Sequence, residues 1–260
     1  MTPRSGRERG FSLIELMIAV TIGLVLTITV SQLFLGSRRT YATTDDVSRM
    51  QENIRYTYQL LTRTIHLAGY KSSPNIKTQD VFTADVNKRI LDGVDAGTGT
   101  GSDSFTVSYE GSSNGPGVAD NTIFDCLGVA VPAGTMVVNT FSIRQDASSR
   151  FGLYCDNGTG ATELVPDVMN MQVLYGMDTD RDLVADTFVT GSPALFADLN
   201  QLMSVRTLKV ALLFQTPNLH AAVTQDTQTH TLLGVELEPF NDTYIRRVIT
   251  LTVNLRNRTP

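Results

Sequence analysis

The stretch that decides the fold is Gly10–Glu15, with the sequence GFSLIE, together with the apolar run that follows it. From Leu16 to Leu35 the chain holds no charged residue, and a run of about 20 such residues is long enough for an α-helix to cross a bilayer. A short basic leader containing Arg4, Arg7 and Arg9 precedes this stretch. Because an excess of arginine marks the cytoplasmic flank of a membrane helix, the sequence predicts that the chain points outward.

Two features distinguish this N-terminus from an ordinary secretory signal. The leader ends in Gly10 and its polar break comes before the apolar run, so no small-residue cleavage site follows the run. Glu15 lies just inside the run, where a carboxylate is costly in lipid and therefore indicates a function. A plainer interpretation is that Glu15 reaches the lipid headgroups, and the residue taken alone favours it.

The register of glycine, phenylalanine, glutamate and apolar run resembles the class III signal of type IV pilins and pseudopilins. The resemblance implies that a membrane-embedded prepilin peptidase cleaves between Gly10 and Phe11, and that Phe11 becomes N-methylphenylalanine. It also implies that Glu15 neutralises the terminal amine of a neighbouring subunit in the filament core. A buried ion pair is tolerable only when both charges meet, so this pair can set the register between subunits.

The length and the net charge of the chain predict one sizeable, acidic globular head. The chain of 260 residues has a net charge of −5, and its length allows one large or two small domains. The leader holds three arginines and one glutamate, so processing leaves 18 basic and 25 acidic residues and a net charge of −7. We expect no bulk nucleic-acid binding, which needs a basic surface. The pairs Arg38-Arg39 and Arg246-Arg247 are interpreted as a membrane-flanking pair and a solvated strand face.

The chain contains two cysteines, Cys126 and Cys155. The predicted outward topology places them in an oxidising compartment, where a structural disulfide is expected. Such a bridge closes a loop of about 30 residues and contributes about 3–4 kcal/mol of stability. No Cys-x-x-Cys spacing is present, so neither a redox motif nor a thiolate zinc site is predicted.

A helical pattern continues beyond the apolar run. Apolar residues recur at steps of three and four at Val47, Met50, Ile54, Tyr58, Leu61, Ile65 and Ala68. The charged residues between them, expected to face solvent, are Asp45, Asp46, Arg49, Glu52, Arg55 and Arg63. This period is typical of a helix with one buried face. We therefore expect one long helix from about Ser12 to Leu67, ended by Gly69 and Pro74.

After Tyr70 the chain changes to short runs of alternating polarity that predict β-strands. The expected strands are Ser104–Glu110, Asn139–Arg144, Phe151–Cys155, Met169–Tyr175, Val205–Phe214 and Ile249–Leu255. Long linkers are expected at Asp92–Asp103, Gly111–Asn121 and Asn218–Leu232. The alternation favours an antiparallel sheet with one face covered by the amphipathic helix.

The predicted fold class is α+β, with a long N-terminal helix packed on an antiparallel β-sheet head. Residues 1–10 form a cytoplasmic leader and residues 11–36 a transmembrane and filament-core helix. Residues 37–70 form the amphipathic second half of that helix, and residues 71–260 form the β-rich head.

Four segments outside the signal resemble the PilW group of minor pilins. They are Gln51–Asn53, Leu67–Tyr70, Asp125–Gly128 and Val173–Asp180. The resemblance implies a low-abundance subunit that primes pilus assembly and sits at the filament tip, supporting twitching motility, adhesion or DNA uptake. Its implied partners are the major pilin, other minor pilins (PilX, PilV and FimU-like), a PilY-type adhesin and the inner-membrane assembly platform. The implied location is the inner membrane with a periplasmic head, and then the pilus tip. The J-type pseudopilin of type II secretion, which shares this plan, stays an alternative.

One acidic pattern resembles a metal site, formed by Asp178, Asp180, Asp182 and Asp186. Carboxylates at alternate positions can converge on a calcium ion, as in the first half of an EF-hand loop. However, Leu183 and Val189 stand where the turn glycine and the bidentate glutamate belong. A solvated acidic turn with local hydrogen bonds is therefore favoured, and calcium is the alternative. No other cofactor is expected. A membrane-anchored module that binds calcium or another ligand is the alternative from a different functional class.

The sequence carries no recognisable catalytic constellation. His66, His220 and His230 are widely spaced, and no serine or cysteine stands in a nucleophile-elbow motif. The glycine-rich segment Gly97–Gly101 lacks the Gly-Lys-Ser/Thr of a phosphate-binding loop. We expect that the chain is not an enzyme.

Overall fold

The structure is a computed structural model that describes residues 10–73, 75–83, 85, 88–97, 101–219, 222 and 224–257. The leader arginines, the predicted helix-ending Pro74 and His220 lie outside these residues. The chain divides into two compact units, Met1–Asp45 and Asp46–Pro260.

In the first unit, helix α1 (Leu13–Leu67) is unbroken through Gly23 and Gly36. Its apolar N-terminal part has a mean hydropathy of 2.4 and is exposed, and its length and composition suffice to cross a membrane. The hydroxyls of Thr27, Thr29 and Ser31 each donate a 2.8 Å hydrogen bond to the carbonyl four residues earlier. These polar groups are satisfied within the helix, which lowers the cost of placing them in lipid.

In the second unit, α1 buries the predicted face at Met50, Leu61 and Ile65, with Ala68 just after it, and it also buries polar residues that were not predicted. The buried residues are Asp46, Met50, Thr57, Leu61, Thr64 and Ile65. Tyr58, predicted to be buried, is 52% exposed. The hydroxyls of Thr57 and Thr64 donate hydrogen bonds to the carbonyls four residues earlier. Because these hydroxyls are satisfied within the helix, the two threonines can be buried although they are polar.

Asp46 was predicted to face solvent and is buried instead. Its Oδ1 accepts a 2.7 Å hydrogen bond from Nδ2 of Asn218, a residue 172 positions away in the chain. A buried carboxylate persists when it has such a partner, and no local pattern could have indicated this one.

The end of α1 agrees with the prediction. Gly69 has φ +73°, in the left-handed region that terminates helices. Its N–H donates to the carbonyl of Ser108 on β2 (Ser104–Glu110) at 2.9 Å. A side chain at Gly69 would also meet the carbonyl oxygen of Asn257, so the close approach requires glycine at this position.

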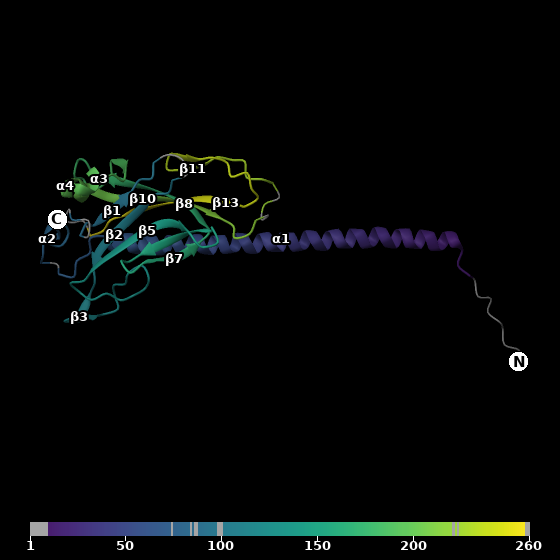
Figure 1. Ribbon diagram of the computed structural model, residues 1–260, viewed down its shortest axis with the longest axis horizontal. Helices are drawn as coiled ribbons and strands as arrows, with labels where there is room; N and C mark the ends of the chain where they lie inside the picture. Colours follow the sequence, from purple (N-terminus) through teal and green to yellow (C-terminus); the bar gives the residue numbers. More distant parts are fainter. Residues whose placement is uncertain are drawn as a thin grey trace. The chain divides into compact units, whose positions relative to one another are not determined.

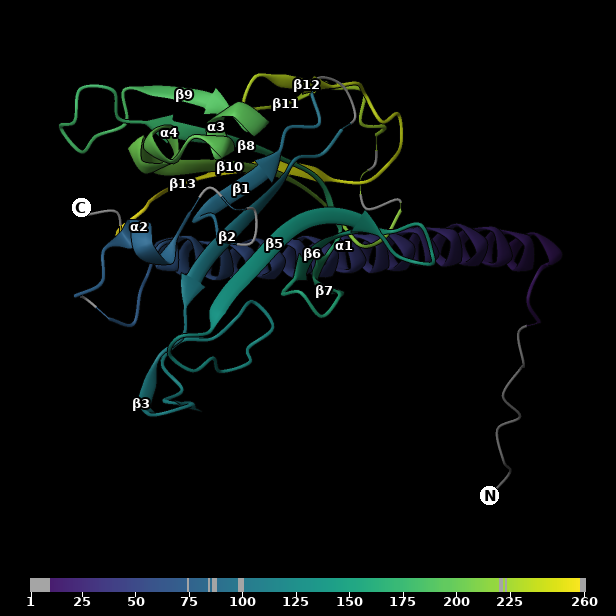
Figure 2. The same cartoon turned by 60° about the vertical axis from the view of Figure 1, so that its left-hand side comes forward.

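The head confirms the predicted α+β class with antiparallel sheets, and its described residues form two larger sheets and two small hairpins where one sheet was expected (Figure 1). The five-stranded sheet has the order β1 (Leu91–Val94), β2, β5 (Met136–Gln145), β6 (Phe151–Asp156) and β7 (Ala161–Pro166). The four-stranded sheet has the order β13 (Arg246–Asn254), β10 (Val205–Gln215), β8 (Val168–Met177) and β9 (Thr187–Thr190). Small hairpins are formed by β3 (Ser113–Gly115) with β4 (Val118–Ala119), and by β11 (His230–Leu232) with β12 (Val235–Leu237). The short helices are α2 (Thr78–Val81), α3 (Pro193–Ala197) and α4 (Leu199–Ser204); Figure 2 shows α3 and α4 beside the four-stranded sheet.

Each of the six predicted strands overlaps an observed strand, and Ser104–Glu110 matches end to end. All three predicted linkers were partly wrong, and the last of them, Asn218–Leu232, ends in β11. Asp92–Val94 belongs to β1, which pairs with β2, and Gly111–Asn121 contains the β3–β4 hairpin. Both segments are rich in Gly, Asp and Ser, so pairing with neighbouring strands rather than local propensity decides their structure.

Strand β10 carries apolar side chains on both of its faces. Leu208, Val210 and Leu212 join the main core, whereas Ala211 and Leu213 join a second cluster with Leu232 and Leu237 under the β11–β12 hairpin. Both faces of this strand are therefore covered, which is why its sequence is nearly all apolar.

The predicted alternation of Met169 with Met171 and the following residues was wrong at its first position. A bulge displaces the β8–β10 register next to Leu213, and Met169 packs against the second cluster while Met171 is in the main core. An extra residue in one strand changes which face the following side chains occupy.

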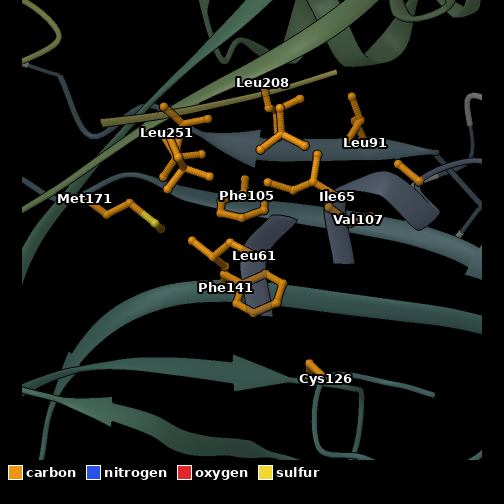
Figure 3. Packing of buried hydrophobic residues seen from close by; sticks show 14 of the residues in the cluster. Leu61, Ile65, Leu91, Phe105, Val107, Cys126, Phe141, Met171, Leu208 and Leu251 are labelled. Carbon is orange, nitrogen blue, oxygen red and sulfur yellow. The ribbon is translucent and has the colours of Figure 1, made fainter. Parts of the chain in front are cut away.

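The main core lies between α1 and the two sheets (Figure 3). Leu61 and Ile65 of α1 lie among Phe105 and Phe141 of the five-stranded sheet and leucines of the four-stranded sheet, including Leu208 and Leu251. The rings of Phe105 and Phe141 stack with their centroids 5.1 Å apart. This core fixes the second half of α1 to the head and positions the loops described below.

Candidate functional site

The N-terminal segment forms a reciprocal helix cap. The backbone N–H of Glu15 donates to Oγ of Ser12 at 3.2 Å, and the backbone N–H of Ser12 approaches Oε2 of Glu15 at 3.5 Å. This is the capping box of a Ser-x-x-Glu sequence, in which each side chain satisfies a backbone donor at the helix start. The Glu15 carboxylate is thus held at the positive end of the helix dipole, close in sequence to the predicted new N-terminus at Phe11.

The predicted cleavage residues lie before the first helical turn. Gly10 is exposed and Phe11 is 85% exposed, and neither is in a helix or strand. A peptidase requires an accessible backbone at the bond it cuts, and the exposure of Gly10 and Phe11 is consistent with this. Cleavage at Gly10, methylation of Phe11 and subunit pairing through Glu15 stay predictions.

The predicted disulfide is present between Cys126 and Cys155. It joins the loop after the β3–β4 hairpin to β6, and a buried polar chain supports it. The backbone N–H of Cys126 donates to Oδ1 of Asn139 at 3.2 Å, and Nδ2 of Asn139 donates to the Tyr109 hydroxyl at 2.8 Å. Burial raises the pKa of Tyr109 far above its ordinary value, so this hydroxyl stays protonated and donates to the carbonyl of Phe124 at 2.7 Å.

The structure brings together three of the four aspartates proposed as a calcium site. Carboxylate oxygens of Asp178, Asp180 and Asp186 lie within 4.8 Å of one another, and Asp182 is not in this group. Asp182 instead accepts a 2.8 Å hydrogen bond from the N–H of Val184. The spacing of the aspartates therefore predicted a carboxylate cluster, but it did not predict which three aspartates form it.

The clustered carboxylates already have protein donors. Asp178 accepts from Nε of Arg206 at 3.0 Å and from backbone N–H groups of the loop, and Asp186 accepts twice from Thr179 at 2.7 Å. Burial raises the pKa of Asp178, but the hydrogen bonds from Arg206 and from the loop outweigh it and hold the pKa below its ordinary value. A cation would have to compete with a guanidinium for Asp178, so the geometry favours a closed acidic turn.

A buried charge cluster at the end of β13 is the feature that the sequence interpretation missed. Arg246, assigned to a solvated strand face, has a side chain that is only 1% exposed. Its guanidinium bonds to Asp242 at 2.7 Å and to Asp226 at 3.2 Å, and it lies over the ring of Phe240. Nε2 of His230 is 2.7 Å from the same Asp226. The aspartates at 226 and 242 were the available signal, but nothing in their spacing links them to Arg246.

The described histidines do not form a catalytic group. His66 lies at the end of α1, where burial and the charge of Arg256 lower its pKa, and His230 belongs to the Arg246 cluster.

Two family models match the chain. Residues 140–257 match the Type IV Pilus-assembly protein W (PilW), and residues 5–31 match the Prokaryotic N-terminal methylation motif. A search of curated proteins gave no match. Among solved structures, a type IV-like pilin from Thermus thermophilus is similar, with 16% identity and a TM-score of 0.44, over 82% of this chain and 98% of that one.

The methylation-motif match covers the predicted signal, and the PilW match covers Val173–Asp180, one of the four segments that carried the predicted PilW resemblance. The other three segments, Gln51–Asn53, Leu67–Tyr70 and Asp125–Gly128, lie outside the PilW match. The two matches confirm that resemblance at the level of the family. The chain is type IV pilin-like, with an N-terminal methylation motif at residues 5–31 and a PilW minor pilin domain at residues 140–257.

Proposed function

We propose that this chain is a minor type IV pilin that primes pilus assembly and is incorporated at or near the filament tip. Its head would face the periplasm while α1 anchors it in the inner membrane, and the assembly platform would then move it into the filament. Its partners would be the major pilin, other minor pilins of the PilX, PilV and FimU-like types, and a PilY-type adhesin. The role is structural and not enzymatic.

The observation that carries this proposal is the carboxylate of Glu15 at the start of an exposed apolar helix. A charge at this position is costly in lipid unless a cation accompanies it. Cleavage after Gly10 would create such a cation at Phe11, and pairing with a neighbouring subunit would neutralise both charges. A permanently anchored binding module has no use for that cut.

The test is a clean deletion of the gene, with surface pili and secreted exoproteins measured in the same cultures. Loss of pili and of surface motility with normal secretion supports the minor pilin. Normal pili with exoproteins trapped in the periplasm would contradict it and favour the J-type pseudopilin. Unchanged pili and unchanged secretion would favour the anchored calcium- or ligand-binding module.

A further inference from the structure

The head carries a groove between α1, the disulfide loop and the edge of the five-stranded sheet. Its volume is about 530 Å³, and its walls are residues 56–63 of α1, the loop 125–128 and the outer strand β7. The three walls belong to one compact unit. A cavity of this size fits a few side chains of a polypeptide or a small ligand.

The floor of the groove is apolar. Leu60, Leu127 and Leu164 are partly buried and pack on the main core from below, and the disulfide-bonded Cys126 lies beside them. Tyr56, on the rim, is 49% exposed although it is a large aromatic residue. A concave apolar floor with an exposed aromatic rim is the arrangement that a protein partner buries.

The rim of the groove carries one guanidinium, Arg63, and one carboxylate, Asp125, and these two groups do not form an ion pair. Oδ1 of Asp125 accepts hydrogen bonds from the N–H groups of Leu127 and Val129, and its Oδ2 accepts one from Asn157. The guanidinium of Arg63 lies over the ring of Phe124 at 5.3 Å. Throughout the part of the chain that the structure describes, no carboxylate lies within ion-pair distance of Arg63.

Other arginines of the head have the carboxylate partner that Arg63 lacks. Arg55, Arg89, Arg150 and Arg206 each contact a carboxylate at 2.8–3.0 Å. The oxygens of Asp125 accept hydrogen bonds from within the head, whereas the fork of donors on Arg63 can bind a carboxylate of a ligand.

The strand wall indicates the form of the ligand. In the described sheet β7 pairs only with β6, and this leaves its other edge without a strand partner. An unpaired edge beside a helix and an apolar pocket is the arrangement by which domains take an extended peptide, with backbone contacts for affinity and side-chain pockets for specificity.

We propose that this groove binds an extended segment of a partner polypeptide, in which a leucine-sized apolar side chain stands next to a carboxylate. The apolar side chain lies on Leu60, Leu127 and Leu164, and the carboxylate pairs with Arg63. Binding of a peptide in this groove does not require filament entry, so this proposal can fail without the proposed pilin role failing, and the reverse.

The test uses the full chain in lipid nanodiscs and a displayed library of random peptides, with empty nanodiscs to remove background binders. We expect the enriched peptides to place Asp or Glu beside Leu, Ile, Met or Phe. The best peptide should bind the Arg63→Glu variant at least about tenfold more weakly, as expected for a lost charge-assisted hydrogen bond. Changing its acidic residue to lysine should restore binding to that variant.

Two variants complete the design. Arg55→Glu changes an exposed arginine of the same helix outside the groove and should leave peptide binding unchanged. Thr162→Trp fills the groove from an exposed position of β7 and should abolish binding while the circular dichroism spectrum and melting temperature stay those of the wild type. Enriched peptides without a carboxylate, equal binding to the Arg63→Glu variant, or no enrichment above empty nanodiscs would each overturn the proposal.

Discussion

At the scale of single residues, Glu15 combines two interactions that substitutions can separate. It caps the first turn of α1 together with Ser12, and we propose that it also neutralises the new N-terminus of a neighbouring subunit. Glutamine can serve as the third residue of a capping box, since its amide oxygen accepts the same bond, but it carries no charge.

The first prediction compares Glu15→Gln with Glu15→Ala. Both variants should enter the membrane and be processed, and both should fail to enter filaments, because both lack the charge that pairs with the amine. Immunoblots of sheared pili and of membranes check this. Filament entry of Glu15→Gln at the wild-type level would show that the helix cap alone explains the glutamate.

The second prediction concerns Arg246, which neutralises two partly buried aspartates. Arg246→Met should lower the free energy of unfolding of the head by about 1–3 kcal/mol, because it removes the guanidinium from two partly buried carboxylates that keep only His230 and backbone donors. Urea unfolding at neutral pH measures the loss. Arg247→Met, at the exposed neighbouring position, should change stability by less than about 0.5 kcal/mol. Equal losses for the two variants would refute the buried cluster.

At the scale of elements, the disulfide ties the loop 125–128 to β6, and with it one wall of the groove. Cys126 and Cys155 are separated by 29 residues, and the bridge limits the freedom of that loop in the unfolded chain. The buried Asn139 holds the same loop from below, so the fold does not rest on the disulfide alone.

The third prediction is that the Cys126→Ala, Cys155→Ala double variant folds but is less stable by about 3–4 kcal/mol. Chemical denaturation of both proteins under oxidising conditions measures the difference. Under a strong reductant the wild type should fall to the stability of the double variant. A double variant that is as stable as the oxidised wild type would mean that the bridge does not constrain the unfolded chain.

The loop between β8 and β9 is a second element whose chemistry the structure constrains. Arg206 and backbone N–H groups occupy the Asp178 carboxylate, and these are the bonds a calcium ion would have to displace. The fourth prediction is that about 1 mM calcium, the range in which extracellular modules bind, leaves the melting temperature unchanged. Isothermal titration provides an independent measurement. Saturable binding that disappears in the Asp180→Asn, Asp186→Asn variant would restore the calcium site.

At the scale of the whole molecule, the titration of the aspartates makes the stability of the head depend on pH. The pKa values of Asp120, Asp186 and Asp242 lie below the ordinary value, since hydrogen bonds from Thr122, Thr179 and Arg246 favour the charged form. Burial raises the pKa of Asp103 and acts in the opposite direction. More aspartates therefore have a lowered pKa than a raised pKa.

The fifth prediction follows from the direction of these pKa shifts. A carboxyl whose folded pKa is depressed contributes its full stability above its unfolded pKa of about 3.9 and loses it as the pH falls through the folded value. The head should therefore be most stable above about pH 5 and should lose stability steadily below about pH 4. Thermal unfolding of the full chain across this range checks it. A melting temperature that rises on acidification would mean that groups such as Asp103 dominate.

The sequence by itself determined the features that depend on neighbouring residues. The apolar run, the Ser-x-x-Glu start and the glycine at position 69 predicted α1 to within a residue at each end, because helix start, period and end are local properties. Alternating polarity placed the strands, and the N-terminal motif indicated the family. The pairing of the two cysteines followed from their number and compartment.

The tertiary structure alone decided whatever depends on contacts between distant residues. The β11–β12 hairpin covers the second face of β10, and the burial of Asp46 follows from a bond to Asn218 far along the chain. Arg246 is buried because two loop aspartates meet it, and Arg63 stands beside a groove that three separate segments build. Such contacts leave no period or motif in the sequence, since burial of a charge is decided by the partner that the fold brings to it.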